Sequence, residues 1–95
     1  MLKKIYTIRD SKGEIYHTPF FQNTHGEAER SFRTAVNDPQ TSIYKYPEDY
    51  SLWYMGEYDD NTGLFKTKPP EHMIQAIACV KKTTIASLDD VSKDC

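Results

Sequence analysis

The spacing of hydrophobic and polar side chains in residues 1–21 predicts a β-hairpin. Residues 2–9 are rich in β-branched and aromatic side chains, as is typical of a strand. Asp10, Ser11 and Gly13 come directly after it, and these residue types favour a tight turn. Residues 14–21 then return as a second strand, in which Pro19 limits pairing and indicates a sheet edge or a strand end.

The pattern then changes to a helical period, and we predict a helix over about residues 26–37. Thr24 and Glu27 have the S/T-x-x-E spacing of a capping box, in which each side chain satisfies a backbone donor of the first turn. Asn37 and Pro39 end the helix. Four apolar side chains fall at i, i+4, i+7 and i+8 and form one stripe: Ala28, Phe32, Ala35 and Val36.

A second hairpin is predicted after a loop over residues 40–50. Residues 51–58 alternate as a strand, residues 59–63 form a hairpin loop with glycine at its end, and residues 64–68 form the fourth strand. Strict alternation places Leu52, Tyr54, Gly56 and Tyr58 on one face and Trp53, Met55 and Glu57 on the other. Both faces hold aromatic side chains, so the pattern leaves open which face is buried.

The segment after Pro69 and Pro70 is predicted as a second helix, with proline in its first turn and Lys81 and Lys82 in its last. Its apolar residues are Met73, Ile74, Ile77 and Val80. A strand over residues 73–80 is an alternative, because the run is apolar on both the helical and the strand period.

Together these elements predict an α+β fold in the order β-β-α-β-β-α: a four-stranded antiparallel sheet with one packed helix and a second, C-terminal helix. The helix over residues 26–37 packs its apolar stripe on one face of the sheet. The expected core consists of Ile5 or Tyr6, with Ile8, Ile15, Phe32, Val36, Leu52, Phe65, Met73 and Ile77.

Length and charge divide the chain into one domain, residues 1–82, and a flexible acidic tail, residues 83–95. Residues 1–82 hold 11 basic and 11 acidic side chains, whereas the tail holds one lysine and three aspartates. The formal charge of −2 therefore belongs to the tail. Such a segment either recruits a protein partner or competes for a basic groove, unless it is simply a frayed terminus.

Several functional classes are not supported by the sequence. No apolar run approaches the roughly 20 residues of a membrane span, and the N-terminus lacks the apolar region of a signal peptide. Cys79 and Cys95 do not form a disulfide framework, which favours a reducing cytoplasm. The histidines have no metal-ligand spacing, and no nucleophile or phosphate-binding motif occurs. We therefore expect no enzyme, metal or cofactor.

The strongest functional signal is the interleaving of aromatic and basic residues, since aromatics make up 13% of the chain. Single-stranded nucleic acid uses this mixture, because bases stack on aromatic faces while cations neutralise phosphates. The same residues also suit cross-strand packing and the protection of sheet edges. Candidate stacking residues on one sheet face are Tyr6, Tyr54, Tyr58 and Phe65, and candidate phosphate-binding residues are Lys3, Lys4, Arg9, Lys45, Lys66 and Lys68.

Two hypotheses follow. In the first, the chain binds single-stranded DNA without sequence specificity, as a homodimer that doubles a short site. In the second, it is a protein–protein adaptor or scaffolding factor, with Trp53, Tyr44, Tyr46 and Tyr50 as exposed interface anchors. Binding to a double-stranded DNA groove is disfavoured, because the exposed face of the helix over residues 26–37 is half acidic.

Several stretches together resemble the small non-structural protein of gokushoviruses, the single-stranded-DNA phages of the Microviridae. They are residues 5–12 (IYTIRDSK), 19–21 (PFF) with 26–28 (GEA), 35–39 (AVNDP), 46–52 (YPEDYSL) and 56–63 (GEYDDNTG). Their order and spacing cover about residues 3–80. The resemblance implies a DNA-binding protein in the host cytoplasm that helps to commit genome replication to single-stranded DNA for packaging. It implies no catalytic residues and supplies no agreed binding residues.

Overall fold

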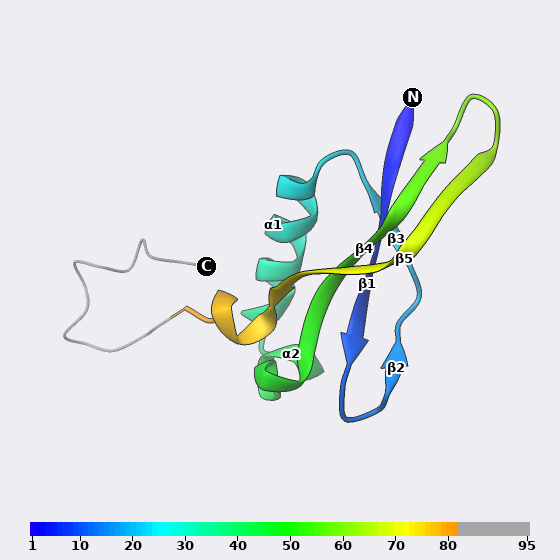
Figure 1. Ribbon diagram of the computed structural model, residues 1–95. Coiled ribbons are helices and arrows are strands. Elements are labelled where there is room, and N and C mark those ends of the chain that lie inside the picture. The colour runs from blue at the N-terminus through cyan, green and yellow to red at the C-terminus, as the bar shows by residue number, and fades with distance from the viewer. Residues whose placement is uncertain (82–95) are drawn as a thin grey trace.

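The computed structural model describes residues 1–81 and has two layers, an antiparallel sheet and a helical layer on one of its faces (Figure 1). The predicted α+β class is confirmed. The expected tail, residues 83–95, lies outside the described residues. The elements are β1 (Leu2–Asp10), β2 (Ile15–Tyr16), β3 (Phe20–Gln22), α1 (His25–Val36), α2 (Ser42–Lys45), the 3-10 turn η1 (Pro47–Asp49), β4 (Tyr50–Asp59), β5 (Leu64–Gln75) and the 3-10 turn η2 (Ala76–Cys79).

Strand β1 is central, because it pairs with β4 along one side and with both β2 and β3 along the other. The strand predicted over residues 14–21 is therefore two short strands. Pro19 lies in the gap between them and has no N–H to donate to β1. Polar contacts bridge part of this gap: the His17 N–H donates to the Ile8 carbonyl (2.8 Å), and the Thr7 hydroxyl donates to the His17 carbonyl (2.6 Å).

Helix α1 begins as its capping residues predict. The Thr24 hydroxyl accepts a hydrogen bond from the Glu27 N–H (3.1 Å), and the Glu27 carboxylate accepts one from the Asn23 N–H (3.3 Å). The carboxylate thus reaches one residue beyond the donor of a standard capping box. Asn37 caps the other end, so the predicted helix is confirmed to within one residue.

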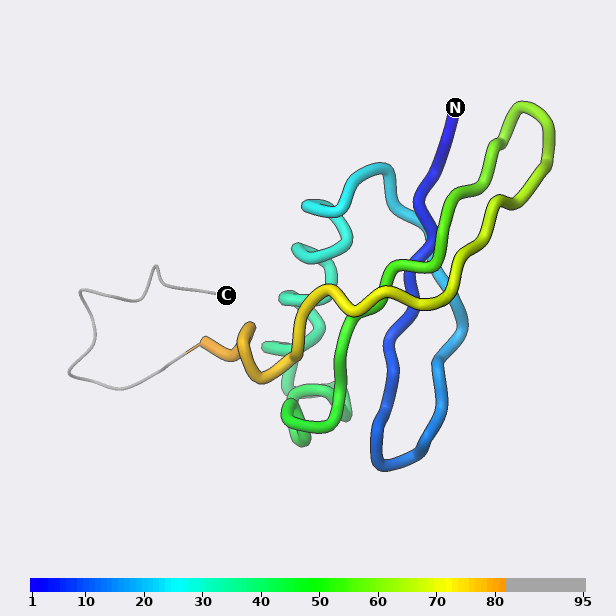
Figure 2. The backbone as a smooth tube through the Cα atoms, viewed as in Figure 1, coloured from blue at the N-terminus to red at the C-terminus, as the bar shows by residue number. Residues whose placement is uncertain are grey.

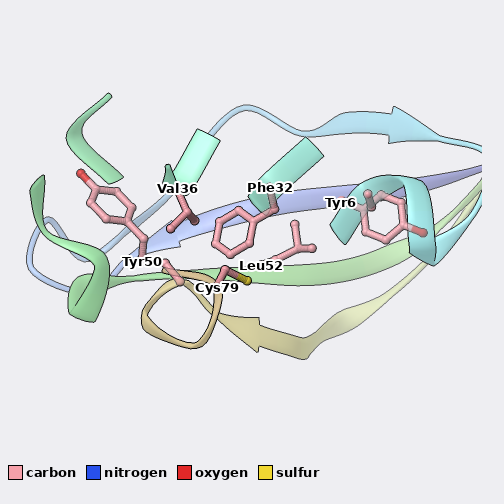
Figure 3. Packing of buried hydrophobic residues seen from close by; sticks show 8 residues of the cluster. Tyr6, Phe32, Val36, Tyr50, Leu52 and Cys79 are labelled. Atoms are coloured by element: carbon pink, nitrogen blue, oxygen red, sulfur yellow. The ribbon is translucent and has the colours of Figure 1, made fainter. Parts of the chain in front are cut away.

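The core lies between α1 and one face of the sheet (Figure 3). Its largest fully buried side chains include Tyr6, Phe32, Leu52, Val36 and Cys79. Ile8 and Met73 pack against this cluster while partly exposed. Three predicted core residues are wrong, since Ile15, Phe65 and Ile77 are each half-exposed or more. Ile5 is buried but points away from α1, so it lies outside the cluster.

The C-terminal part of the described chain differs from the predicted helix. Strand β5 continues through Pro69 and Pro70 to Gln75, and only the turn η2 is helical. The prolines are tolerated because β5 is an edge strand and its register to β4 shifts there. Figure 2 shows β5 bending part-way along its length, which brings η2 to the helical layer. There Ala76 and Cys79 enter the core.

The Asn37 side chain holds this end of the described chain against α1. Its Nδ2 donates to the Cys79 carbonyl (3.0 Å), and its Oδ1 accepts from the Lys81 N–H (2.9 Å). One amide therefore caps the helix and fixes the segment that follows η2.

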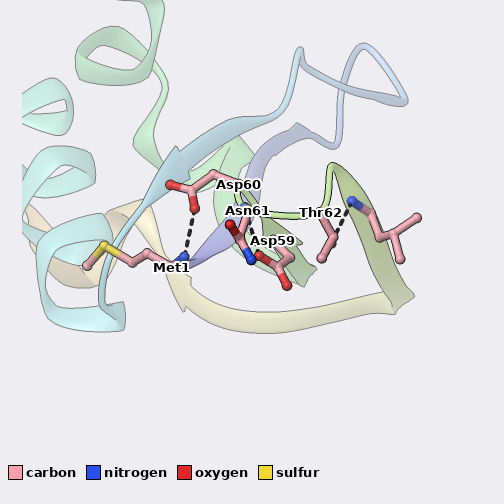
Figure 4. A network of polar contacts seen from close by, with 6 residues as sticks. Met1, Asp59, Asp60, Asn61 and Thr62 are labelled. Carbon is pink, nitrogen blue, oxygen red and sulfur yellow. Dashed lines mark hydrogen bonds and ion pairs between the residues drawn. The ribbon is translucent and has the colours of Figure 1, made fainter.

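The first part of β5 and the end of β4 form a long hairpin arm that runs beside the N-terminus (Figures 1 and 4). In its loop the Asp59 carboxylate accepts from the Asn61 N–H (2.9 Å), which lowers the pKa of Asp59. Gly63 closes the loop with a positive φ of 77°. The Met1 ammonium pairs with Asp60 at 2.7 Å. The acidic run of residues 59–63 is thus accounted for by a hairpin.

Candidate nucleic-acid interface

A bulge in β4 determines what each face of the sheet presents. Pairing of β1 with β4 steps from Ile5–Gly56 to Tyr6–Tyr54, so Met55 has no partner on β1. One extra residue in a strand shifts the alternation of all side chains beyond it. In β4, even-numbered residues before Met55 therefore face the helix, whereas even-numbered residues after it face the opposite side of the sheet.

Glycine is required at the bulge for two reasons. Gly56 has a φ of +132°, which side-chain-bearing residues rarely adopt. A Cβ atom there would also stand 2.3 Å from the Lys66 carbonyl oxygen of β5. The strict alternation predicted for residues 51–58 is therefore wrong: Tyr54 and Tyr58 lie on opposite faces of the sheet.

We call the face turned away from α1 the outer face. Side chains of paired residues lie on the same face of a sheet, and successive side chains along a strand alternate between faces. Tyr6 packs under α1, so its neighbours Ile5 and Thr7 lie on the outer face, and the pairing assigns the rest. The outer face consists of Lys3, Ile5, Thr7, Arg9, Tyr16, Phe21, Ser51, Trp53, Gly56, Tyr58, Phe65, Thr67, His72 and Gln75.

Three aromatic rings from three strands meet on the outer face beside the hairpin arm, and we call them the arm cluster: Phe21, Tyr58 and Phe65. Ring centroids are 4.8 Å apart for Tyr58 and Phe65, 5.6 Å for Phe21 and Tyr58, and 6.4 Å for Phe21 and Phe65. Phe65 is 60% exposed and Phe21 is 43% exposed. Lys3 is the pairing partner of Tyr58 on β1, so a basic residue neighbours this cluster on the outer face.

Three further rings form a second group on the same face, which we call the Trp53 cluster: Tyr16, Trp53 and His72. Trp53 contacts Tyr16 at 5.9 Å and His72 at 5.2 Å, both nearly perpendicular. The Arg9 guanidinium lies 4.8 Å from the centre of the Tyr16 ring. The outer face therefore holds two aromatic groups, each with a cation beside it.

The charged residues of the outer face are basic. Lys3 and Arg9 belong to it, and among the described residues that form this face none is acidic. The carboxylates of Asp10, Glu57 and Glu71 lie in rows of the opposite face. A polyanion that approaches the outer face therefore meets aromatic rings and positive charge.

The predicted set of four stacking residues does not share one face of the sheet, because Tyr6 and Tyr54 lie on the helix side. Tyr6 is fully buried, and its hydroxyl shares a 2.6 Å hydrogen bond with His25 Nδ1. Burial raises the pKa of Tyr6 to about 12. Tyr54 lies on the helix side with its ring 5.6 Å from Tyr6 and 4.8 Å from His25. Tyr58 and Phe65 remain as candidates.

The predicted cations are also divided between the faces. Lys3 and Arg9 lie on the outer face, as described above. Lys4 and Lys66 lie on the helix side, and both pair with Glu57, which stands between them. Lys68 forms an ion pair with Glu71, and its ammonium lies 5.1 Å from the centre of the Tyr54 ring.

Lys45 lies on α2, whose Ile43 packs against the core, so this lysine belongs to the helical layer. Of the anchors expected for an adaptor, Tyr50 is buried, whereas Tyr44 and Tyr46 are exposed beside Lys45. These two tyrosines are therefore the anchors that the structure leaves accessible on the helix side.

Sequence reasoning did not include Tyr16, Phe21 and His72 among its candidates, and it proposed Trp53 only as an anchor for a protein partner. The pairing of β1 with β2 and β3 would have identified two of them. Tyr16 pairs with Arg9 and Phe21 pairs with Ile5, and both partners lie on the outer face. His72 could not be found, since the sequence favoured a helix there.

Two other features are absent from the part of the chain that the structure describes. Within residues 1–81, no group of three His, Cys, Asp or Glu side chains could hold a metal ion. No helix of that part of the chain is long and apolar enough to cross a membrane.

Comparison with known proteins identifies the family. A family model described as "Phage ORF5 protein" matches residues 3–79, and the chain belongs to this family of bacteriophage proteins. No curated protein matches the chain, and no solved structure matches it.

Proposed function

We propose that this member of the Phage ORF5 protein family binds single-stranded DNA, without sequence specificity and without catalysing a reaction, on the outer face of its sheet. The observation that carries the proposal is the arm cluster: Phe65 and Phe21 are exposed beside Lys3 on a face that has no acidic residue among its described members. Exposed bases stack on such rings, and each stacked base contributes about 1–3 kcal/mol.

Large exposed aromatic side chains favour this use over a purely structural one. Cross-strand packing alone accounts for Tyr58, which touches rings on both sides. It does not account for Phe65, which leaves 60% of its surface in water at the sheet edge. Together with Phe21 it forms a contiguous exposed apolar patch, and such patches are typical of interaction sites, unlike single exposed side chains.

In the finer form of the proposal, the phage is a gokushovirus of the Microviridae, and the protein acts in the host cytoplasm during genome replication. The resemblance of residues 3–80 supports this form. Coating the displaced strand would prevent its conversion to duplex and so commit it to packaging. A homodimer would present two outer faces to one strand and raise the apparent affinity by linking two weak sites.

The proposal is tested by titrating the full chain with oligo-dT and with a duplex of the same length at several salt concentrations. Oligo-dT should bind in preference to the duplex. The logarithm of its affinity should fall with the logarithm of salt concentration, by about 0.7 for each phosphate contact. Absence of oligo-dT binding at low salt, or an affinity independent of salt, would refute the proposal.

The adaptor function is the second candidate, favoured by the exposed Tyr44 and Tyr46. Tyr44 lines a cleft of about 500 Å³ with Val36, Pro39 and Pro47, on the side of the molecule away from the outer face. Capture from infected cells distinguishes the two: an adaptor retains its protein partner after nuclease treatment, and loses it when Tyr44 and Tyr46 are replaced by serine.

A further inference from the structure

Trp53 stands between two perpendicular rings that come from strands on either side of it. Strand β1 separates β2 from β4, so Tyr16 approaches Trp53 from one side and His72, on β5, approaches from the other. The side chain of β1 between them is Thr7, which pairs with Trp53 and is small enough to let Tyr16 reach across. The three rings therefore form one continuous aromatic surface.

Hydrogen bonds fix the orientation of two of these rings. Trp53 Nε1 donates to the Ser51 hydroxyl at 2.7 Å, and His72 Nε2 lies 2.8 Å from Gln75 Oε1. A ring that is already immobilised loses little conformational entropy when a ligand binds. The rings lie over Thr7, which is fully buried, and no element of residues 1–81 covers the rings themselves. Such immobilised and uncovered rings suit a binding surface.

Arg9 supplies the charge beside this surface. It pairs with Tyr16 on the neighbouring strand, and its guanidinium rests 4.8 Å from the centre of that ring. Stacking on an aromatic ring fixes the plane of a guanidinium and leaves its N–H donors at the rim. Phosphate and carboxylate are the anions whose geometry this donor set fits, and phosphate is the one that a strand of nucleic acid supplies.

We propose that the Trp53 cluster and Arg9 form a nucleotide-binding subsite, in which one base packs on the rings of Trp53 and His72 and an adjacent phosphate binds Arg9. The inference rests on the proposed function and locates a second contact for the same strand of DNA. The arm cluster lies four residues further along β1, from Thr7 back to Lys3, or about 13 Å at 3.3 Å per residue. A single extended strand therefore bridges both groups of rings.

The experiment uses the intrinsic fluorescence of Trp53, the one tryptophan in the chain. Oligo-dT should quench it, because a base stacked on or beside the indole contacts it directly. Trp53→Leu and His72→Ala should each weaken binding by roughly 10- to 100-fold. These affinities are measured by the fluorescence anisotropy of end-labelled oligo-dT, because Trp53→Leu has no tryptophan signal. The matched control is Tyr46→Leu, which removes an exposed ring from the helix side and should leave the affinity unchanged.

Arg9 is tested by the salt dependence. Arg9→Gln should reduce the slope of log affinity against log salt by about 0.7, the loss of one phosphate contact. Arg30→Gln removes the same charge from an exposed position on α1 and should leave the slope unchanged. Thermal melting of each variant checks that the domain is folded, and Trp53→Phe retains a ring if Trp53→Leu does not fold.

The results separate this inference from the proposed function. If oligo-dT binds but leaves Trp53 fluorescence and the Arg9→Gln slope unchanged, the subsite is wrong and the function stands. If no oligonucleotide binds, the function itself is wrong. Quenching together with a reduced slope supports both.

Discussion

Tyr54 and Tyr58 lie four residues apart on one strand, yet their rings lie on opposite faces of the sheet. Tyr54 packs against Tyr6 on the helix side, whereas Tyr58 packs against Phe21 and Phe65 on the outer face. The bulge at Met55 between them is the cause. Without the bulge, strict alternation would place Tyr58 on the same face as Tyr54, and the outer face would lack the central ring of the arm cluster.

Replacing each of these tyrosines by alanine should therefore have different effects. Tyr58→Ala should weaken oligo-dT binding by about 1–3 kcal/mol, the contribution of one stacked base. Tyr54→Ala should leave DNA affinity almost unchanged and lower stability instead, because its ring fills the space between Tyr6 and His25. Fluorescence titration and urea unfolding of both variants make the comparison, and equal affinities would contradict the assignment of the faces.

The Gly56→Ala variant should be strongly destabilised. The new Cβ would stand 2.3 Å from the Lys66 carbonyl oxygen, at a φ of +132°. Backbone strain of this kind costs about 1–3 kcal/mol, before any displacement of β5. Urea unfolding measures the loss. Gly26→Ala is the matched control, because a Cβ at this position of α1 would meet only the Thr24 hydroxyl, at an ordinary contact distance of 3.9 Å. Similar stability of the two variants would show that the bulge is not required.

Phe32→Ala should cost about 3–5 kcal/mol of unfolding free energy, because the ring is 99% buried at the centre of the core, with 1% exposed. That is a large part of the stability of a domain of this size. Ala35→Gly on the same helix provides a comparison for the loss of helix propensity alone, which is about 1 kcal/mol. Melting of Phe32→Ala at the wild-type temperature would remove α1 from the core.

The stability of the domain should depend on the ionisation of Tyr6 at high pH. Burial raises the pKa of Tyr6 to about 12 in the folded protein, against 10.0 for the unperturbed group. Folding thus favours the neutral phenol. Its contribution to the free energy of unfolding is complete below pH 10 and is lost as the pH rises towards 12. Two pKa units correspond to at most about 3 kcal/mol.

Urea unfolding at pH 8, 10 and 11 tests this dependence on Tyr6. The wild type loses other interactions over the same range, so the informative quantity is its difference from Tyr6→Phe. That difference should shrink as the pH rises. A constant difference would mean that Tyr6 ionises equally in the folded and unfolded states.

The sequence by itself determined the local elements. Thr24 and Glu27 indicated the start of α1, and the residues of two turns indicated the ends of the hairpins. A β-branched and aromatic run predicted β1, and an alternating, aromatic-rich run predicted β4. These features are local because each depends on backbone groups within a few residues. The α+β class follows from their order.

The tertiary structure alone decided which face each aromatic residue occupies and how the chain continues after Pro70. The bulge depends on a close approach between Gly56 and β5, and β5 is extended to Gln75 because it pairs with β4. Both are contacts between strands that an alternation of hydrophobic residues does not encode. For that reason the sequence indicated aromatic and basic residues as candidates for binding, and only the packing of the sheet separated core tyrosines from those exposed on the outer face.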